Sequence, residues 1–487
     1  MAPIRRMPHD VLEQIFIACL PAHRNCVMSA QEAPVLLGRI CSSWRSLSLA
    51  TPRLWCRLHI VLPNSDRSPS FPDLCISKIA QRLEVASTWL TRSGDCPLSI
   101  SLERNLYPGS DLDPQEKFLE LLTRHILRWQ NMRLSLTWQG GQRLSELSEN
   151  DAPLLASLDL SLPSSEDAWT WSPSSILHTP SLSRFGFFVS CKHPWNLPLR
   201  WSNLTDLLLR FSSWDGQSGF DCRTAQDIVS RCHMLQRCKF IFEGISAFSP
   251  PDNMSYSSSL RVLELQCYRS PIRTSGYLFK HLSLPRLREF KLIGSQDSDD
   301  PQDGDLGGLT STLVSCASLE TILIQVEVFT KPALIFFLES LPSTVQCLEF
   351  IAPSLGWEQH SLDDDVLQVL EAGLGHPVAC PALRELTINV AHLLSDDALC
   401  RFVVSRAPTL RRVHITFLRE KQVDILTRLQ SFIAAGLEIC VEYRDPPALI
   451  HPRFSPWEGL CDYDSDPLTL SSDSQDSRGW RLSSYGG

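Results

Sequence analysis

The sequence of 487 residues lacks several features that mark particular protein classes. It has no C-x-x-C pair, and its 17 cysteines stand singly, the closest two being Cys232 and Cys238. Structural zinc sites need tightly spaced cysteine and histidine ligands, and disulfide scaffolds are short and cysteine-dense. We therefore expect a reduced compartment, cytosol or nucleus, with no metal, cofactor or disulfide required and with cysteines serving as small core residues.

Long apolar runs and an excess of positive charge are also missing. No stretch of about 18 apolar residues occurs, so no membrane span is expected, and residues 1–10 do not resemble a secretory signal. Only eight lysines occur, and the net charge is −9 from 45 basic and 54 acidic residues. Nucleic-acid binding needs clustered basic side chains, and no such cluster is present. Neither a membrane nor a nucleic acid is expected as a partner.

Catalytic motifs are absent. The patterns G-x-x-x-x-G-K, H-E-x-x-H and G-x-S-x-G do not occur, and the 13 histidines are isolated. His392 and His414 fall near predicted strands, with Asp396 and Asp397 close by in the sequence, so a carboxylate–histidine pair is conceivable. An isolated surface histidine is far commoner. We predict no catalytic, cofactor-binding or metal-binding residues, which disfavours a hydrolase or transferase.

Two stretches near the start of the chain have the spacing of amphipathic helices. In 8–20 and in 34–49 the apolar residues recur every three or four positions, and a proline follows each stretch. The residues between them, 22–33, are polar and predict a loop. The apolar residues 58–62 predict a short strand.

This region reads MPHDVLEQIFIACLP and then LLGRICSSWRSLSLATPRLWCRL, and it resembles the F-box. The F-box pattern opens with a leucine, a proline and an acidic residue, and continues with two helices that end at a proline and a tryptophan. The matching positions here are Met7-Pro8, Asp10, Leu12, Ile15, Phe16, Cys41, Trp44-Arg45, Pro52, Leu54 and Trp55. Met7 replaces the usual leucine, a volume-conserving exchange. The loop 22–33 is longer than usual, as in the large F-box families of mushroom-forming fungi.

The resemblance implies that residues 8–60 bind the Skp adaptor of a cullin-based ubiquitin ligase. The side chains that the resemblance assigns to adaptor binding are Pro8, Val11, Leu12, Ile15, Phe16, Cys41, Trp44, Leu54 and Trp55. Some of them belong to the core of the module and others to its interface, and the sequence does not sort them. The competing interpretation is two amphipathic helices that pack on their own protein.

A short pattern, apolar-x-x-apolar-x-apolar, then recurs ten times at a mean spacing of about 28 residues. The copies begin at Leu155, Leu182, Leu204, Leu235, Leu260, Leu287, Leu319, Val345, Leu383 and Leu410. Helical stretches lie between them, for example 305–316, 332–340, 363–372 and 396–407. This period is typical of leucine-rich repeats, in which each unit is too small to bury its core alone and must stack on its neighbours. A set of unrelated βα units in an enzyme is the rival interpretation.

The predicted fold class is therefore α/β, with an F-box-like helical module followed by an irregular leucine-rich-repeat solenoid of parallel strands and helices. Helices are expected at 73–93 and 114–128, and strands at 96–102 and 132–138. The predicted organisation is an F-box-like domain at 1–60, a helix–strand linker with first, atypical repeats at 61–150, the solenoid at 151–445, and a disordered, acidic and serine-rich tail at 446–487.

Strand side chains alternate, so the residues on either side of the second apolar position should point away from the core. We predict that this face binds a target protein through Glu289, Lys291, Glu385, Thr387, Arg412 and His414. The expected function is a substrate-recognition adaptor of a Skp–cullin–F-box ubiquitin ligase, which acts only by bringing target and conjugating enzyme together. The alternative is a stand-alone repeat scaffold whose N-terminal helices cap the array and which has no role in ubiquitin ligation.

Overall fold

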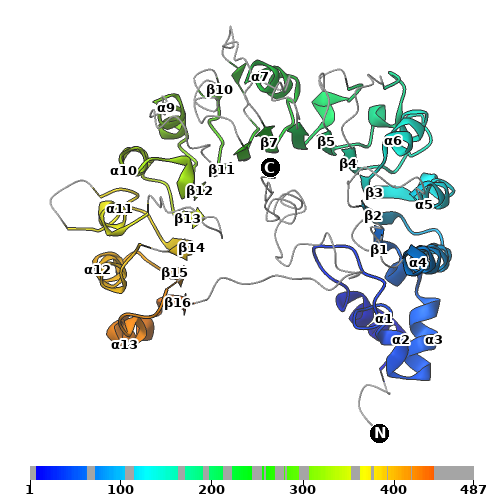
Figure 1. The fold of residues 1–487 in the computed structure, drawn as a ribbon, viewed down its shortest axis with the longest axis horizontal. Coiled ribbons are helices and arrows are strands. Elements are labelled where there is room, and N and C mark those ends of the chain that lie inside the picture. Colours follow the sequence, from blue (N-terminus) through cyan, green and yellow to red (C-terminus); the bar gives the residue numbers. More distant parts are fainter. Residues whose placement is uncertain are drawn as a thin grey trace, which may run out of the picture. The chain divides into compact units, whose positions relative to one another are not determined.

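The fold is described from a computed structural model, drawn in Figure 1. The described residues are 7–62, 72–104, 115–162, 171–189, 197–211, 222–243, 255–256, 259–268, 279, 282–294, 307–351, 362–373, 378–391, 393–417 and 419–443. The predicted tail 446–487, most of the acidic loop 295–308 and His392 lie outside these residues.

The chain forms two compact units, Met1–Phe187 with Pro198–Arg200, and Trp201–Leu449 with Phe188–Leu197. Each unit pairs parallel strands with helices, and in each the longer helices lie on one side of the strands (Figure 1). The strands of the first unit are β1 (Arg57–Leu62), β2 (Leu98–Arg104), β3 (Trp129–Ser135), β4 (Ser157–Leu162) and most of β5 (Arg184–Val189).

The second unit contains nine further strands of the long parallel arrangement. They are β6 (Asp206–Phe211), β7 (Arg237–Glu243), β9 (Val262–Tyr268), β11 (Glu289–Gly294), β12 (Thr321–Gln325), β13 (Cys347–Ile351), β14 (Glu385–Ala391), β15 (Arg412–Phe417) and β16 (Glu438–Tyr443). Two short strands, β8 (Ser255–Tyr256) and β10 (Leu282–Ser283), pair separately. In both units the strand order follows the chain, as expected when every strand is followed by a return segment on the same side.

The helices of the first unit are α1 (His9–Ala18), α2 (Leu37–Ile40), α3 (Ser42–Ala50), α4 (Pro72–Arg92), α5 (Gln115–Thr123) and α6 (Trp138–Ser145). Its 3-10 turns are η2 (Pro52–Trp55), η3 (Ile126–Arg128) and η4 (Ile176–His178). The second unit has η6 (Trp201–Asn203), α7 (Cys222–Arg231), α9 (Gly307–Ser315), η7 (Val326–Val328), α10 (Lys331–Glu339), α11 (Asp364–Val369), α12 (Asp396–Arg406), α13 (Ile425–Arg428) and α14 (Gln430–Ala434). Within the described residues no helix is long and apolar enough to cross a membrane.

The repeating apolar pattern forms the core. All thirty side chains at the three apolar positions of the ten predicted copies are buried, and none is more than 3% exposed. Parallel register stacks equivalent positions, so that Leu207 pairs with Cys238, Cys238 with Leu263, and Leu263 with Phe290. Each such side chain contributes about 1.5–3 kcal/mol through burial, largely against its neighbouring repeats. The predicted pattern and its inward face are confirmed.

The strands β1, β3 and β16 extend the same arrangement beyond the ten copies. In β1 the apolar positions are Trp55, Leu58 and Ile60, and in β3 they begin at Trp129, all of them buried. The strands at β1 and β3 were predicted but not counted as copies, because tryptophan occupies the usual leucine position. At β16 the equivalent position is Gly436, and the strand's apolar side chains are only half-buried.

Three expected elements differ in their limits. The single helix predicted at 34–49 is divided, because Cys41 is extended (φ −160°, ψ 170°) between α2 and α3. The helix predicted at 114–128 ends at Thr123 and continues as the 3-10 turn η3. The strand predicted at 132–138 ends at Ser135, since Thr137 accepts a hydrogen bond from the Gly140 amide and begins α6.

Candidate functional site

The N-terminal helices α1, α2 and α3 form a module whose core contains part of the predicted adaptor-binding set. Leu12, Phe16 and Leu54 are buried, and the Phe16 ring packs against Trp44 at a centroid distance of 4.8 Å. Ile15 and Trp44 are half-buried. These five side chains hold the module together, so replacing Leu12 or Phe16 would act first on folding.

Trp55 also belongs to the core and joins the module to the first repeat. Its indole Nε1–H donates to the Ser48 carbonyl at 2.8 Å, and its ring meets the Trp89 ring edge-on at 4.8 Å. The Arg92 guanidinium lies 4.7 Å from the same ring centroid. At 3% exposure, Trp55 offers little surface to any partner.

The remaining predicted positions are exposed, and the structure adds apolar neighbours that the motif did not include. Pro8, Val11 and Cys41 are exposed, Val11 at 41%. Further exposed apolar side chains of the module are Met7 (38%), Leu36 (39%), Ile40 (57%) and Leu49 (41%). Single exposed apolar residues are ordinary, but five large ones within about 45 residues form an unusual concentration. Sequence reasoning missed Ile40, because the single helix predicted at 34–49 gave no sign of the extended Cys41 that follows it.

The segment 22–33 was expected to be a polar loop, yet Cys26 and Val27 in it are fully buried. Val27 forms a parallel bridge with His59 of β1, and the His59 amide donates to the Cys26 carbonyl at 2.8 Å. Burial raises the pKa of the Cys26 thiol to about 12, against the opposing effect of Arg57. Open strand edges invite unwanted pairing. The segment therefore covers the edge of β1, and the N-terminal module caps the first unit.

The six predicted target-binding residues lie on β11, β14 and β15 and alternate with the core. Core positions are buried, whereas Glu289, Lys291, Glu385 and Thr387 are half-buried and Arg412 is exposed. Lys291 Nζ lies 2.9 Å from Glu289 Oε1. Burial lowers the pKa of Lys291, but Glu289 and neighbouring carboxylates raise it, and the net change is upward. The predicted alternation is confirmed, and binding by this face stays a prediction.

Outward residues of β14, β15 and β16 align into a row of alternating charge. Glu385, Arg412 and Glu438 pair in register on β14, β15 and β16. The Arg412 guanidinium donates to Glu438 Oε2 at 2.9 Å and to Glu385 Oε2 at 3.4 Å. These carboxylates raise the pKa of Arg412, with Glu438 contributing most. All three side chains remain accessible to a partner.

On β7 and β9 the outward residues were expected to be exposed, and instead Lys239, Glu264 and Gln266 are buried. Lys239 Nζ lies 2.8 Å from Glu264 Oε1, with side-chain exposures of 4% and 7%. Gln266 Nε2 donates to the same oxygen at 2.6 Å. A buried ion pair is costly to form and more costly to break from one side. This pair is closed to a partner, whereas Glu385, Arg412 and Glu438 are accessible.

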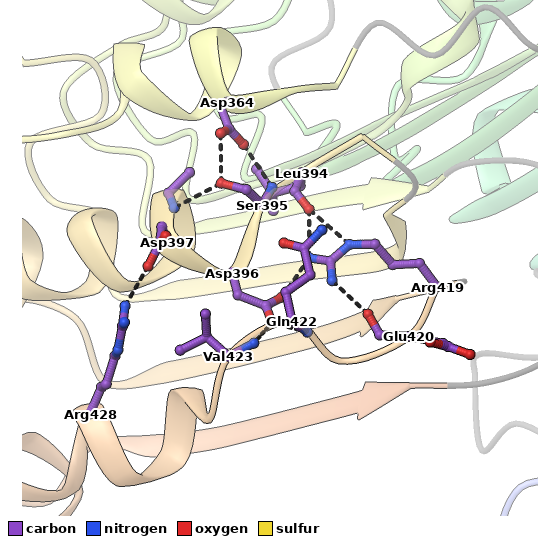
Figure 2. A network of polar contacts seen from close by, with 11 residues as sticks. Asp364, Leu394, Ser395, Asp396, Asp397, Arg419, Glu420, Gln422, Val423 and Arg428 are labelled. Carbon is purple, nitrogen blue, oxygen red and sulfur yellow. Dashed lines mark hydrogen bonds and ion pairs between the residues drawn. The ribbon is translucent and has the colours of Figure 1, made fainter.

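A second polar network joins the loops beside α12, as Figure 2 shows. Asp396 is fully buried and accepts hydrogen bonds from Arg419 Nη2 at 2.5 Å and from the amides of Gln422 and Val423 at 2.9 and 2.7 Å. Burial raises the pKa of this carboxyl, but the Arg419 and backbone donors outweigh it and lower the pKa overall. Asp396 therefore fixes the loop after β15 and is not free to pair with a histidine.

The same network begins the helix. Asp364 accepts hydrogen bonds from the Ser395 amide and hydroxyl at 2.7 and 2.6 Å, and Ser395 Oγ accepts from the Ala398 amide at 3.1 Å (Figure 2). The neighbouring Asp397 forms an exposed ion pair with Arg428. Ser395 is thus the N-cap of α12, and its contacts with Asp364 link the helix to the preceding repeat.

No family model matches the chain, and no curated protein matches it. A solved structure, the leucine-rich repeat-containing protein LegL7 from Legionella pneumophila, is similar at 12% sequence identity over 65% of this chain and 80% of that one. The TM-score of this likeness is 0.28.

Proposed function

We propose that the chain is a substrate receptor of a Skp–cullin–F-box ubiquitin ligase. In this proposal the module 7–55 binds the Skp adaptor, and the outward face of β11–β16 binds the target protein. The observation that carries the first part is the concentration of exposed apolar side chains on the module, together with the F-box-like string. Apolar side chains that remain exposed in a folded module are typical of a partner-binding surface.

The target-binding part is supported by the charge pattern of the strand face. Its outward residues are mixed and polar, and Glu385, Arg412 and Glu438 form a row of alternating charge across three adjacent strands. Such a face suits a protein ligand of complementary charge better than an apolar small molecule, which needs an enclosed pocket.

A second candidate function, a repeat scaffold without a ligase role, is favoured by the edge-covering segment. Cys26 and Val27 pack onto β1, so the module has a structural task even without an adaptor. Repeat arrays need terminal caps. The two functions differ in one respect: a pure cap has no reason to keep Val11 and Ile40 exposed.

Co-purification with the Skp adaptor separates these functions. The variant Val11→Asp with Ile40→Asp changes two exposed side chains and should leave the module folded, while weakening adaptor binding about 100-fold, given about 1.5 kcal/mol per apolar contact. The matched control, Met234→Asp with Val314→Asp, changes two equally exposed apolar residues outside the module and should bind normally. Absence of adaptor binding by the wild-type chain would favour the scaffold.

A further inference from the structure

Three potential metal ligands meet on the last two strands of the second unit. His414 lies on β15, and Cys440 and Glu442 lie on β16. A His414 ring nitrogen, Cys440 Sγ and a Glu442 carboxylate oxygen all lie within 4.8 Å of one another. Cys440 Sγ is 4.0 Å from Glu442 Oε1. From these positions we propose a binding site for a divalent transition metal, with Zn²⁺ as the preferred ion.

The strand register explains how residues far apart in the sequence converge. His414 and Cys440 are directly paired in the parallel ladder, and Glu442 follows Cys440 by two positions, which places it on the same face. No short-range spacing could have revealed this site, because the histidine and the cysteine are 26 positions apart in the sequence. The sequence-based expectation that no residue binds metal is the competing prediction.

Only small side-chain movements are needed to bring the three ligand atoms to metal-binding distances. Zinc bonds of about 2.0–2.3 Å to nitrogen, oxygen and sulfur place tetrahedral ligands about 3.5 Å apart. The three ligand atoms already lie within 4.8 Å of one another, so small side-chain rotations suffice. The Nε2 atom of His414 is shielded from solvent and lacks a hydrogen-bond partner among the described residues. A metal bond would satisfy such a nitrogen.

The donor set and the local charge indicate which ion fits. Thiolate and imidazole favour Zn²⁺ over Mg²⁺ or Ca²⁺, which prefer oxygen ligands. Arg412 lies two residues before His414 on the same face, but its charge is offset by Glu385 and Glu438. Three protein ligands leave a fourth position for water. The ion would connect β16 to β15 and so stabilise the last described strand.

The site can be tested with Co²⁺, which reports thiolate ligation by its charge-transfer absorption. The full chain should bind one Co²⁺ with a thiolate band and tetrahedral visible bands, and Zn²⁺ should displace it. Both His414→Ala and Cys440→Ser should remove this signal and weaken Zn²⁺ binding by more than 100-fold, beyond the about 10–100-fold typical of losing a group that only orients a ligand. The control Cys347→Ser alters a thiol on the same face and should keep the signal.

Hydrogen exchange provides a second measurement that does not depend on the other cysteines of the chain. Zn²⁺ should slow amide exchange in β16 of the wild type and have no such effect in Cys440→Ser. The proposal is overturned if the wild-type chain gives no thiolate band, or if the band survives His414→Ala. Because neither measurement involves the adaptor, the outcome is independent of the proposed function.

Discussion

The buried carboxylate of Asp396 offers a sharp test of how the repeats are joined. Asp396→Asn keeps the size of the side chain but removes its charge and turns one acceptor into a donor. Both carboxylate oxygens face donors, Arg419 on one side and the amides of Gln422 and Val423 on the other. Either orientation of the asparagine leaves an N–H group against another donor. Breaking a buried, charge-assisted network from one side costs about 3 kcal/mol.

Hydrogen exchange measures this loss locally. A cost of about 3 kcal/mol corresponds to about 100-fold faster exchange through local opening, since 1.4 kcal/mol is a factor of ten. We expect the change in α12, α13 and β16, with little effect in β1–β3. The matched control is Asp397→Asn, the adjacent residue, whose ion pair with Arg428 is exposed and should matter little. Equal effects of the two variants, or none in either, would refute the reasoning.

The pH dependence of the chain's stability follows from the same contacts of Asp396. The folded-state pKa of Asp396 is lowered below its ordinary value. A depressed carboxyl pKa contributes stability above the unfolded pKa of about 3.9, and this contribution is lost as the pH falls through the folded value. The wild-type chain should therefore lose its stability advantage over Asp396→Asn below about pH 4. An advantage that stays constant through this range would contradict the assignment.

Further predictions concern the strand face and the thiols. Lys239→Met should destabilise the second unit by about 3 kcal/mol in urea unfolding, because the Glu264 carboxylate is left buried without its cation. Adding Glu264→Leu should restore most of this stability, and equal stability of the single and double variants would contradict the prediction. Exchanging the charges of Glu385 and Arg412 should leave the thermal unfolding midpoint nearly unchanged, because this ion pair is exposed. The same exchange should weaken capture of the target that purifies with the wild type, and normal capture would show that this face does not bind the target. In thiol titration of the folded chain, the exposed cysteines Cys19, Cys41 and Cys440 should react first. Burial raises the pKa of Cys26, Cys267 and Cys380 to about 12, so these thiols should react only on unfolding. Fast modification of Cys267 in the folded chain would contradict its burial.

The repeat core could be predicted from sequence because its signal is local. An apolar-x-x-apolar-x-apolar string fixes which strand face is inward, and every side chain at those positions from Leu155 to Ile415 is buried. The pattern failed at β1 and β3, where Trp55 and Trp129 replace the aliphatic residue. A search that accepted tryptophan at the first position would have assigned both predicted strands, 58–62 and 132–138, to the repeat.

The candidate surfaces depend on longer-range contacts and were harder to predict. A helical periodicity does not distinguish buried Leu12 from the exposed residue before it, Val11, because their burial depends on where α3 packs. The burial of Lys239 and Glu264 likewise reverses the rule that charged strand residues face water. His414 and Cys440 meet only through strand register, which the sequence determines far less directly than it determines strand positions.

The most direct test of the proposed function is the affinity of the purified chain for the purified Skp adaptor, measured by titration calorimetry. The proposal predicts saturable one-to-one binding by the wild type. It also predicts about 100-fold weaker binding by Val11→Asp with Ile40→Asp, and unchanged binding by Met234→Asp with Val314→Asp. Wild-type chain that binds no adaptor, or module variants that bind it as tightly as the wild type, would contradict the account.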